Sequence, residues 1–171
     1  ERPEIHLADR YVDAGEFEAD QVKVGGLEAA VVYGPWSVQG EYYAATVDRM
    51  AGEQDPDFGG FYIAGSYFIT GEGRPYKIKS GVFDRVIPAS NFSPKGAGWG
   101  AWEAAIRYSA IDLSDGDIFG GGMATVTAGI NWYLNPNMRI MLDYVNANLD
   151  DRDSAGHIGS TDAVLLRFQV D

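Results

Sequence analysis

The segment from Ile130 to Leu149 reads INWYLNPNMRIMLDYVNANL, and apolar side chains recur at every second position on both sides of its central Asn-Pro-Asn. In a β-strand successive side chains point to opposite faces, so this period predicts two strands, each with one apolar and one mostly polar face. Asn135, Pro136 and Asn137 leave room only for a tight turn between antiparallel strands. The apolar face must therefore meet either a protein core or lipid.

The same two-residue period recurs along most of the 171-residue chain, whereas long stretches with the helical period of about 3.6 are missing. This pattern predicts an all-β, antiparallel fold in a single domain that covers residues 1–171. We expect eight strands: 2–12, 23–34, 36–49, 58–71, 99–113, the two arms of the opening hairpin, and 162–171.

The length of these predicted strands favours lipid over a protein core. They are about 10 to 14 residues long, whereas strands of soluble sandwiches are usually about five or six, and a strand that crosses a bilayer needs about 9 to 11. The turns at Gly34-Pro35 and Asn135-Pro136-Asn137 are minimal. Longer connections, rich in Asp, Glu and Gly, are expected at 13–22, 51–57, 115–121 and 150–161. Short turns on one rim and long loops on the other are typical of an outer-membrane barrel, with the short turns on the periplasmic side.

Aromatic residues flank the two short turns. Tyr33, Trp36, Trp132 and Tyr133 lie next to them, where a membrane barrel carries an aromatic girdle at the lipid–water boundary. A transmembrane antiparallel β-barrel is therefore the expected fold. The alternative that these residues leave open is a soluble β-sandwich with an aromatic core, acting as a binding module.

Composition excludes several classes of function. The formal net charge is −12 and the sequence pI is about 4.4, which argues against nucleic acid because its phosphates would repel the chain. The chain has no cysteine, so neither a disulfide framework nor a thiolate metal site is expected. No stretch approaches the length of a transmembrane helix. Gly-X-Ser-X-Gly, His-Glu-X-X-His and P-loop patterns are missing and the two histidines are far apart, which points away from an enzyme.

Several segments resemble, in the same order, the C-terminal half of the phosphate-selective porin O and P family. The most specific are YGPWSVQGEY (33–42), TGEGRPY (70–76), GAWEAAIRYS (100–109) and GINWYLNPNMRIMLDY (129–144), and the resemblance covers residues 2–171. It implies a sixteen-stranded, homotrimeric porin of the Gram-negative bacterial outer membrane. Such a porin is a water-filled channel for passive diffusion of small hydrophilic solutes, with anions such as phosphate foremost. It needs no cofactor, and its partners are the lipid bilayer, lipopolysaccharide, solute ions and the other copies of the chain.

On this interpretation the eight predicted strands are half of a barrel, and the remaining strands lie outside this sequence. The abrupt start at Glu1-Arg2-Pro3 and the end at RFQVD, without a terminal aromatic residue, fit that expectation. The alternative is a complete eight-stranded outer-membrane barrel, whose interior side chains would fill, acting as a structural anchor or adhesin without a pore.

Charges on the predicted strands should point into the barrel, because an Arg or Lys that faces lipid at the midplane costs about 2–4 kcal/mol. Arginine suits an anion path, since its planar guanidinium donates hydrogen bonds in pairs. The alternative is that the charges pair across strands and only maintain the shape of the barrel. The alternation predicts that the following residues line the pore: Arg10, Arg107, Arg139, Arg167, Glu41, Glu103 and Asp143.

The connection at 72–98 is long and basic, and strand order places it on the periplasmic rim, where turns are normally short. Its charged residues are Arg74, Lys77, Lys79, Arg85 and Lys95 against only Glu72 and Asp84. In phosphate-selective members of the family, lysines near the periplasmic mouth draw anions through, so the resemblance implies that role for Lys77, Lys79 and Lys95. A basic loop packed against the barrel or a neighbouring subunit is the alternative. The remainder of the chain is strongly acidic and would not attract phosphate. The sequence therefore supports a porin more strongly than a phosphate-selective porin.

Overall fold

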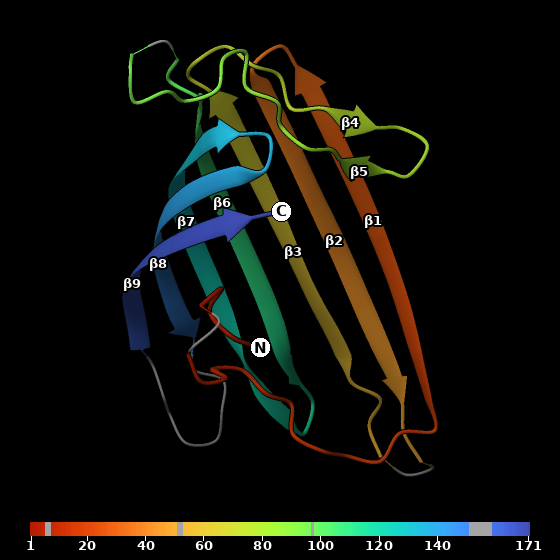
Figure 1. Ribbon diagram of the computed structural model, residues 1–171. Coiled ribbons are helices and arrows are strands. Elements are labelled where there is room, and N and C mark those ends of the chain that lie inside the picture. Colours follow the sequence, from red (N-terminus) through yellow and green to blue (C-terminus); the bar gives the residue numbers. More distant parts are fainter. Residues whose placement is uncertain (6–7, 51–52, 97, 151–158) are drawn as a thin grey trace.

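Seven long strands form one antiparallel sheet in the order β1-β2-β3-β6-β7-β8-β9 (Figure 1). The structure is a computed structural model that describes residues 1–5, 8–50, 53–96, 98–150 and 159–171. Each strand of this sheet pairs with the strands that precede and follow it in the sheet order. The predicted all-β antiparallel fold is therefore confirmed. Among the described residues, no helix is both long enough and apolar enough to cross a membrane.

The strands of the large sheet are 12 to 18 residues long. Their bounds are β1 (Gln21–Tyr33), β2 (Trp36–Asp48), β3 (Asp57–Phe68), β6 (Ala101–Asp115), β7 (Ile118–Asn135), β8 (Met138–Asp150) and β9 (Gly159–Val170). Two short strands, β4 (Tyr76–Lys77) and β5 (Val82–Phe83), form a separate hairpin inside the long connection between β3 and β6. The sheet strands are longer than those of soluble sandwiches and are long enough to cross a bilayer.

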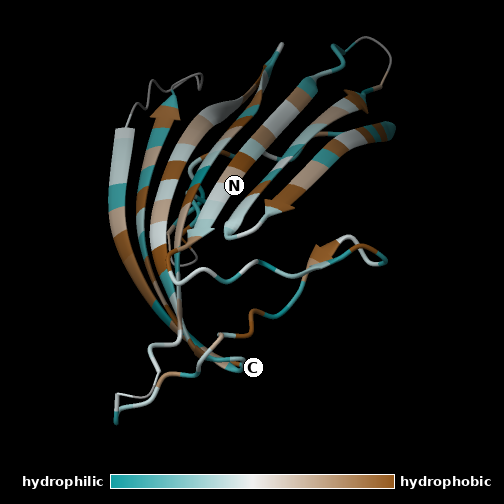
Figure 2. Cartoon of the chain, turned by 90° about the horizontal axis from the view of Figure 1, so that it is seen from above, coloured by the Kyte–Doolittle hydropathy of each residue, from teal (hydrophilic) through white to brown (hydrophobic). Residues whose placement is uncertain are grey.

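The large sheet curves into an open arc, and the N-terminal residues and the β4–β5 hairpin lie on its concave side (Figures 1 and 2). Strands of a sheet twist relative to one another, which gives long sheets this curvature. Strands β1 and β9 form the two edges and do not pair with each other. Closure into a sixteen-stranded barrel therefore stays a prediction.

The register separates the side chains of the sheet into two faces, because directly opposite residues in an antiparallel pair share a face. Leu27, Tyr42, Phe61 and Ala110 form one row on the convex face. Large apolar side chains are exposed along this face, and they include Leu27, Val31, Val38, Ile63, Ile106, Val164 and Leu166. An exposed apolar surface of this extent marks contact with lipid or with another protein.

Aromatic side chains gather on the convex face beside the short turns, as predicted. Trp36 packs against Tyr67 with ring centroids 4.4 Å apart, and Trp102 stacks on Trp132 at 5.0 Å. This is the position of an interfacial girdle in a membrane barrel. Tyr133 does not belong to the girdle, because it is buried and its hydroxyl donates a hydrogen bond to a carboxylate on the concave face.

The rim that carries the short turns is staggered. On this rim, strands β1 and β2 reach only as far as the pair of Tyr33 and Trp36. Trp36 lies in one register row with Ile130 of β7. Strands β7 and β8 continue beyond that row to a bulge near Asn135. Tilted strands in a closed barrel require a progressive stagger of this kind.

The predicted strand at 2–12 is wrong. Residues 1–5 and 8–12 contain no strand, and residues 6–7 lie outside the described part of the chain. Pro3 has no N–H to give to a ladder, and Glu4 has a φ of 57°, which interrupts an extended run. Ile5 and Val12 are buried. The apolar residues of this segment are thus buried without strand pairing, and they do not follow the predicted alternation.

The predicted long loop at 115–121 is also wrong. Only Gly116 and Asp117 separate β6 from β7, and the φ of 57° at Gly116 is what a tight two-residue hairpin turn requires. The other connections on this rim follow β2 and β8 as predicted. Residues 51–52 and 151–158 of these connections lie outside the described residues.

Ala29 and Ala30 on β1 provide a matched test of which face meets lipid. Ala29 lies in the convex row of Ile63, and Ala30 lies in the concave row of Arg107. In the full-length protein folded into lipid vesicles, Ala29→Arg should lower the free energy of unfolding by about 2–4 kcal/mol, because it places a cation among acyl chains. Ala30→Arg should have a much smaller effect. Urea titration followed by tryptophan fluorescence measures both, and equal losses would contradict this assignment of faces.

Candidate functional site

The concave face carries the charged side chains of the strands. The register places Glu41, Glu103, Arg107, Arg139, Asp143 and Arg167 on this one face. These residues come from four strands, β2, β6, β8 and β9. The two-residue alternation therefore brings together six of the seven predicted lining residues; Arg10 is the exception.

Arg10 lies in the segment that precedes β1 and not on a strand. Its side chain is 68% exposed, and its Nη1 lies 3.1 Å from Oδ2 of Asp13. The hydrogen bond from Arg10 lowers the pKa of Asp13, and the backbone N–H of Gly15 adds to the effect. Arg10 is thus paired locally and does not lie on the concave face of a strand with the other predicted residues.

The carboxylate of Glu4 forms three hydrogen bonds with side chains on the concave face of the sheet, which we call the concave wall. Its Oε1 accepts hydrogen bonds from Nε of Arg107 at 2.8 Å and from Oγ of Ser109 at 2.7 Å. Its Oε2 accepts one from Oγ1 of Thr127 at 2.6 Å. The positive φ of Glu4 costs about 1 kcal/mol or more in a residue that has a Cβ, so the surrounding contacts must offset this strain.

The remainder of the N-terminal segment, defined as residues 1–5 and 8–12, continues across the concave face. Val12 is fully buried in a cluster with Met123 and Ala147. The hydroxyl of Tyr11 forms a 2.9 Å hydrogen bond with Oγ1 of Thr161 on β9. The segment therefore covers part of the wall between β6 and β9. Sequence reasoning missed this role because the same alternation of apolar residues was assigned to a strand.

Glu103 is buried beneath the connection between β3 and β6. Its side chain is 0% exposed and forms an ion pair with Arg74 from that connection. The carboxylate also accepts hydrogen bonds from Nδ2 of Asn131 at 3.0 Å and from the Tyr133 hydroxyl at 2.8 Å. A buried charge needs this degree of pairing and hydrogen bonding. Glu103 thus attaches the connection to the wall, and it does not face open space.

The other charged residues of the wall differ in their partners. Arg139 donates from Nε and Nη2 to Oε1 of Gln169, at 3.1 and 2.8 Å. Asp143 occupies the space above Gly129, where an added Cβ would lie 2.0 Å from its Oδ1. Glu41 lies directly opposite Glu28. Like charges in that position are destabilising, so β1 and β2 carry a locally acidic part of the wall.

The long basic connection lies on the rim of the short turns, as strand order predicts. The backbone N–H of Phe92 donates to the carbonyl of Leu134 beside the β7–β8 turn at 2.7 Å. Lys77 forms an ion pair with Asp84 at 2.8 Å, and this hydrogen bond lowers the pKa of Asp84. Lys79 and Lys95 are exposed and form no ion pair with any described residue.

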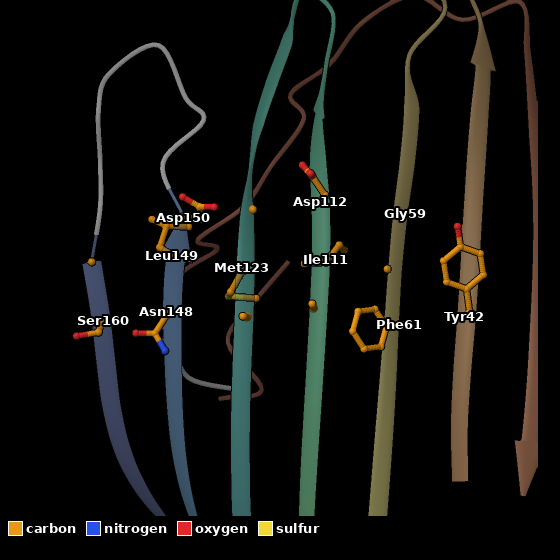
Figure 3. Close-up of a pocket in the computed structure, with 15 residues that line it drawn as sticks. Tyr42, Gly59, Phe61, Ile111, Asp112, Met123, Asn148, Leu149, Asp150 and Ser160 are labelled. Atoms are coloured by element: carbon orange, nitrogen blue, oxygen red, sulfur yellow. The ribbon is translucent and has the colours of Figure 1, made fainter.

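A groove of about 820 Å³ lies apart from this polar wall. Figure 3 shows Tyr42 and Phe61 at one side of it and Asn148 and Ser160 at the other, and these residues belong to one convex-face row. It therefore adds nothing to the charged cluster. Within the described residues, no group of three or more His, Cys, Asp and Glu side chains is placed to hold a metal ion.

The pair of Glu103 and Arg74 should contribute strongly to stability. Glu103→Gln removes the charge that compensates Arg74 in a largely buried position, and it should lower the free energy of unfolding by about 3 kcal/mol. Asp84→Asn is the matched control, because it breaks the exposed pair with Lys77, which solvent screens. Chemical unfolding of the full-length protein compares the two variants. A loss for Glu103→Gln no larger than that for the control would contradict the buried-pair interpretation.

Comparison with known proteins identifies one family over the whole chain and two relatives over most of it. The sequence profile of the family described as phosphate-selective porin O and P matches residues 1–171. Porin O of Pseudomonas aeruginosa strain PAO1 is 31% identical over 166 residues, which cover 91% of this chain and 36% of that protein. An uncharacterized protein of Caulobacter vibrioides is 31% identical over 145 residues, 84% of this chain and 28% of that protein. The chain spans about a third of the length of these relatives. It belongs to the phosphate-selective porin O and P family.

Proposed function

We propose that the chain forms part of the wall of an outer-membrane channel that passes small hydrophilic solutes, with anions such as phosphate foremost, by passive diffusion. The observation that carries this proposal is the division of one sheet into an apolar convex face and a charged concave face. Such a sheet separates an apolar solvent from an aqueous one. Family membership also favours a channel over an enzyme.

The proposal extends to a sixteen-stranded barrel that spans the bacterial outer membrane, contacts lipid and lipopolysaccharide, and assembles from three copies of the protein. The unpaired edges of β1 and β9 support it, because lipid cannot satisfy the backbone groups of an open edge. The relatives are about three times as long as this chain. The alternative, a complete small barrel that serves as an anchor or adhesin, has less support because the seven described strands form an open arc.

Charge is divided across the proposed channel wall. Glu28 and Glu41 lie on β1 and β2. Strands β6, β8 and β9 carry Arg107, Arg139 and Arg167, together with Asp143 and with Glu103, whose charge Arg74 compensates. A solute that passes between these groups crosses a transverse electric field, which orients ions and polar solutes. The three arginines supply the donors that carboxylate and phosphate groups prefer.

The basic connection at 72–98 is proposed to attract anions at the periplasmic mouth. Lys79 and Lys95 are the best placed for this role, because they are exposed and form no ion pair with any described residue. Lys77 contributes less, since Asp84 compensates its charge. The acidic residues on the opposite rim do not attract anions; we propose that they bind divalent ions that bridge lipopolysaccharide.

Planar-bilayer recording of the full-length protein tests the channel and its selectivity. We expect a stepwise conductance whose reversal potential in a salt gradient shows preference for anions. Lys79→Gln combined with Lys95→Gln should reduce the anion-to-cation permeability ratio by about two- to fivefold, because it removes two exposed charges from the mouth. Lys23→Gln, on the other rim and paired with Asp48, is the matched control.

The possible results separate the parts of the proposal. Cation selectivity in the unmodified protein would contradict the anion preference and leave the channel intact. No conductance from the full-length protein, folded in the bilayer, would contradict the channel itself. Equal effects of the lysine pair and of Lys23→Gln would contradict the role of the 72–98 connection.

A further inference from the structure

We propose that Arg107, Ser109 and Thr127 form an anion-binding cradle on the concave wall that accepts a small carboxylate or phosphate group. In this structure the cradle holds the carboxylate of Glu4 from the same chain. The inference rests on the proposed function, because it adds a binding step for an anion that enters the channel. On this proposal, the carboxylate of Glu4 competes with that anion for the same three donors.

The register of the sheet places the three donors together. Arg107 and Ser109 lie two residues apart on β6 and therefore on one face, and Thr127 of β7 lies directly opposite Arg107. Both oxygens of Glu4 are engaged, with donor–acceptor distances of 2.6 to 2.8 Å. Because the ladder between two central strands positions these donors, the cradle persists when Glu4 leaves it.

A ring on the neighbouring strand orients Arg107 independently of Glu4. The guanidinium carbon of Arg107 lies 3.9 Å from the ring centroid of Tyr62 on β3, and a cation in that position is attracted to the face of the ring. Glu4 receives its hydrogen bond from Nε and not from two parallel N–H groups. A free carboxylate or phosphate can approach the guanidinium in the paired geometry, which is the stronger arrangement.

Glu4 is held in a conformation that favours exchange. It has a positive φ, and its N–H donates to the carbonyl of Arg2 at 2.8 Å in a tight turn. Strain of this kind, observed at a residue with a Cβ, is a reason to look for function at that residue. Attachment to the same chain gives Glu4 a local concentration on the order of millimolar, so a free anion competes only at comparable concentrations.

Neighbouring charges keep the binding of a free anion weak. Glu41 lies directly opposite Tyr62 in the same wall, and Glu1 and Arg2 line a small cavity beside Arg107. The two carboxylates repel an anion, and Arg2 attracts it. Weak and rapidly exchanging binding is what conduction requires, because a solute that binds tightly does not leave.

The test is the binding of inorganic phosphate and of acetate to the full-length protein folded in detergent, measured by NMR line broadening of each anion. Glu4→Gln removes the competing charge and should tighten binding of both anions at least fivefold. Adding Arg107→Gln to that variant should cancel the gain. Adding Lys23→Gln instead, which removes a distant cation, should leave the gain intact. Thr127→Val in the Glu4→Gln background removes one hydrogen-bond donor and should reduce the gain in affinity. This variant replaces the Arg107 variant if the latter does not fold.

Equal affinities for the unmodified protein and Glu4→Gln would overturn the proposal. A gain that survives Arg107→Gln would also overturn it, as would a gain that Thr127→Val leaves undiminished where the Arg107 variant does not fold. A gain for phosphate alone would restrict the cradle to phosphate groups, and a gain for acetate alone to carboxylates. The binding assay does not depend on conduction. Absence of conductance in bilayers would therefore contradict the proposed channel, whereas absence of the affinity gain would contradict only the cradle.

Discussion

The backbone hydrogen-bond ladder of one long antiparallel sheet is the interaction on which the rest of the structure depends. Seven strands of 12 to 18 residues each pair in sequence order, and the pairing satisfies backbone groups that lipid would leave unsatisfied. The same ladder sets the register, so one row of residues across the sheet is apolar and the next is polar. A shift of one residue would exchange the two faces, which explains why a strict alternation must be maintained over so many residues.

The alternation made most of the sheet predictable, including the faces of Arg107, Arg139 and Arg167 and the rim on which the long basic connection lies. It failed at residues 2–12, because apolar residues can also be buried without strand pairing, as Ile5 and Val12 are. Pro3 and the positive φ of Glu4 decide against a strand there, and only Pro3 is visible in the sequence. The partners of Glu4 and Glu103 could not be predicted, since they come from segments about 30 to 120 residues away.

The net charge of the chain does not describe the charges of the concave face, where acidic and basic residues both occur. The chain carries a formal net charge of −12, yet many of its acidic residues lie in connections between strands, where water and salt screen them. On the concave face, Glu28 and Glu41 lie on β1 and β2, whereas β6, β8 and β9 carry Arg107, Arg139 and Arg167 together with the acidic residues Glu103 and Asp143. In the proposed channel, a solute on the concave side would respond to these nearby charges more than to the net charge, because groups that line a narrow aqueous path are screened less.

Strand β6 forms ion pairs with both segments that cover the concave wall, the 72–98 connection and the N-terminal segment. It supplies the acidic residue in one pair and the basic residue in the other. Glu103 on β6 holds Arg74 of the long connection, with side chains 0% and 23% exposed. Arg107, four residues further along, holds Glu4 of the N-terminal segment, with side chains 38% and 24% exposed. The first pair is buried, so breaking it leaves a charge without water. In the second pair neither side chain is fully buried, and Arg107 is the most exposed of the four, so we expect water or a free anion to replace Glu4 more readily. We therefore infer that the long connection is the more firmly attached segment and that the Glu4 contact is the exchangeable one.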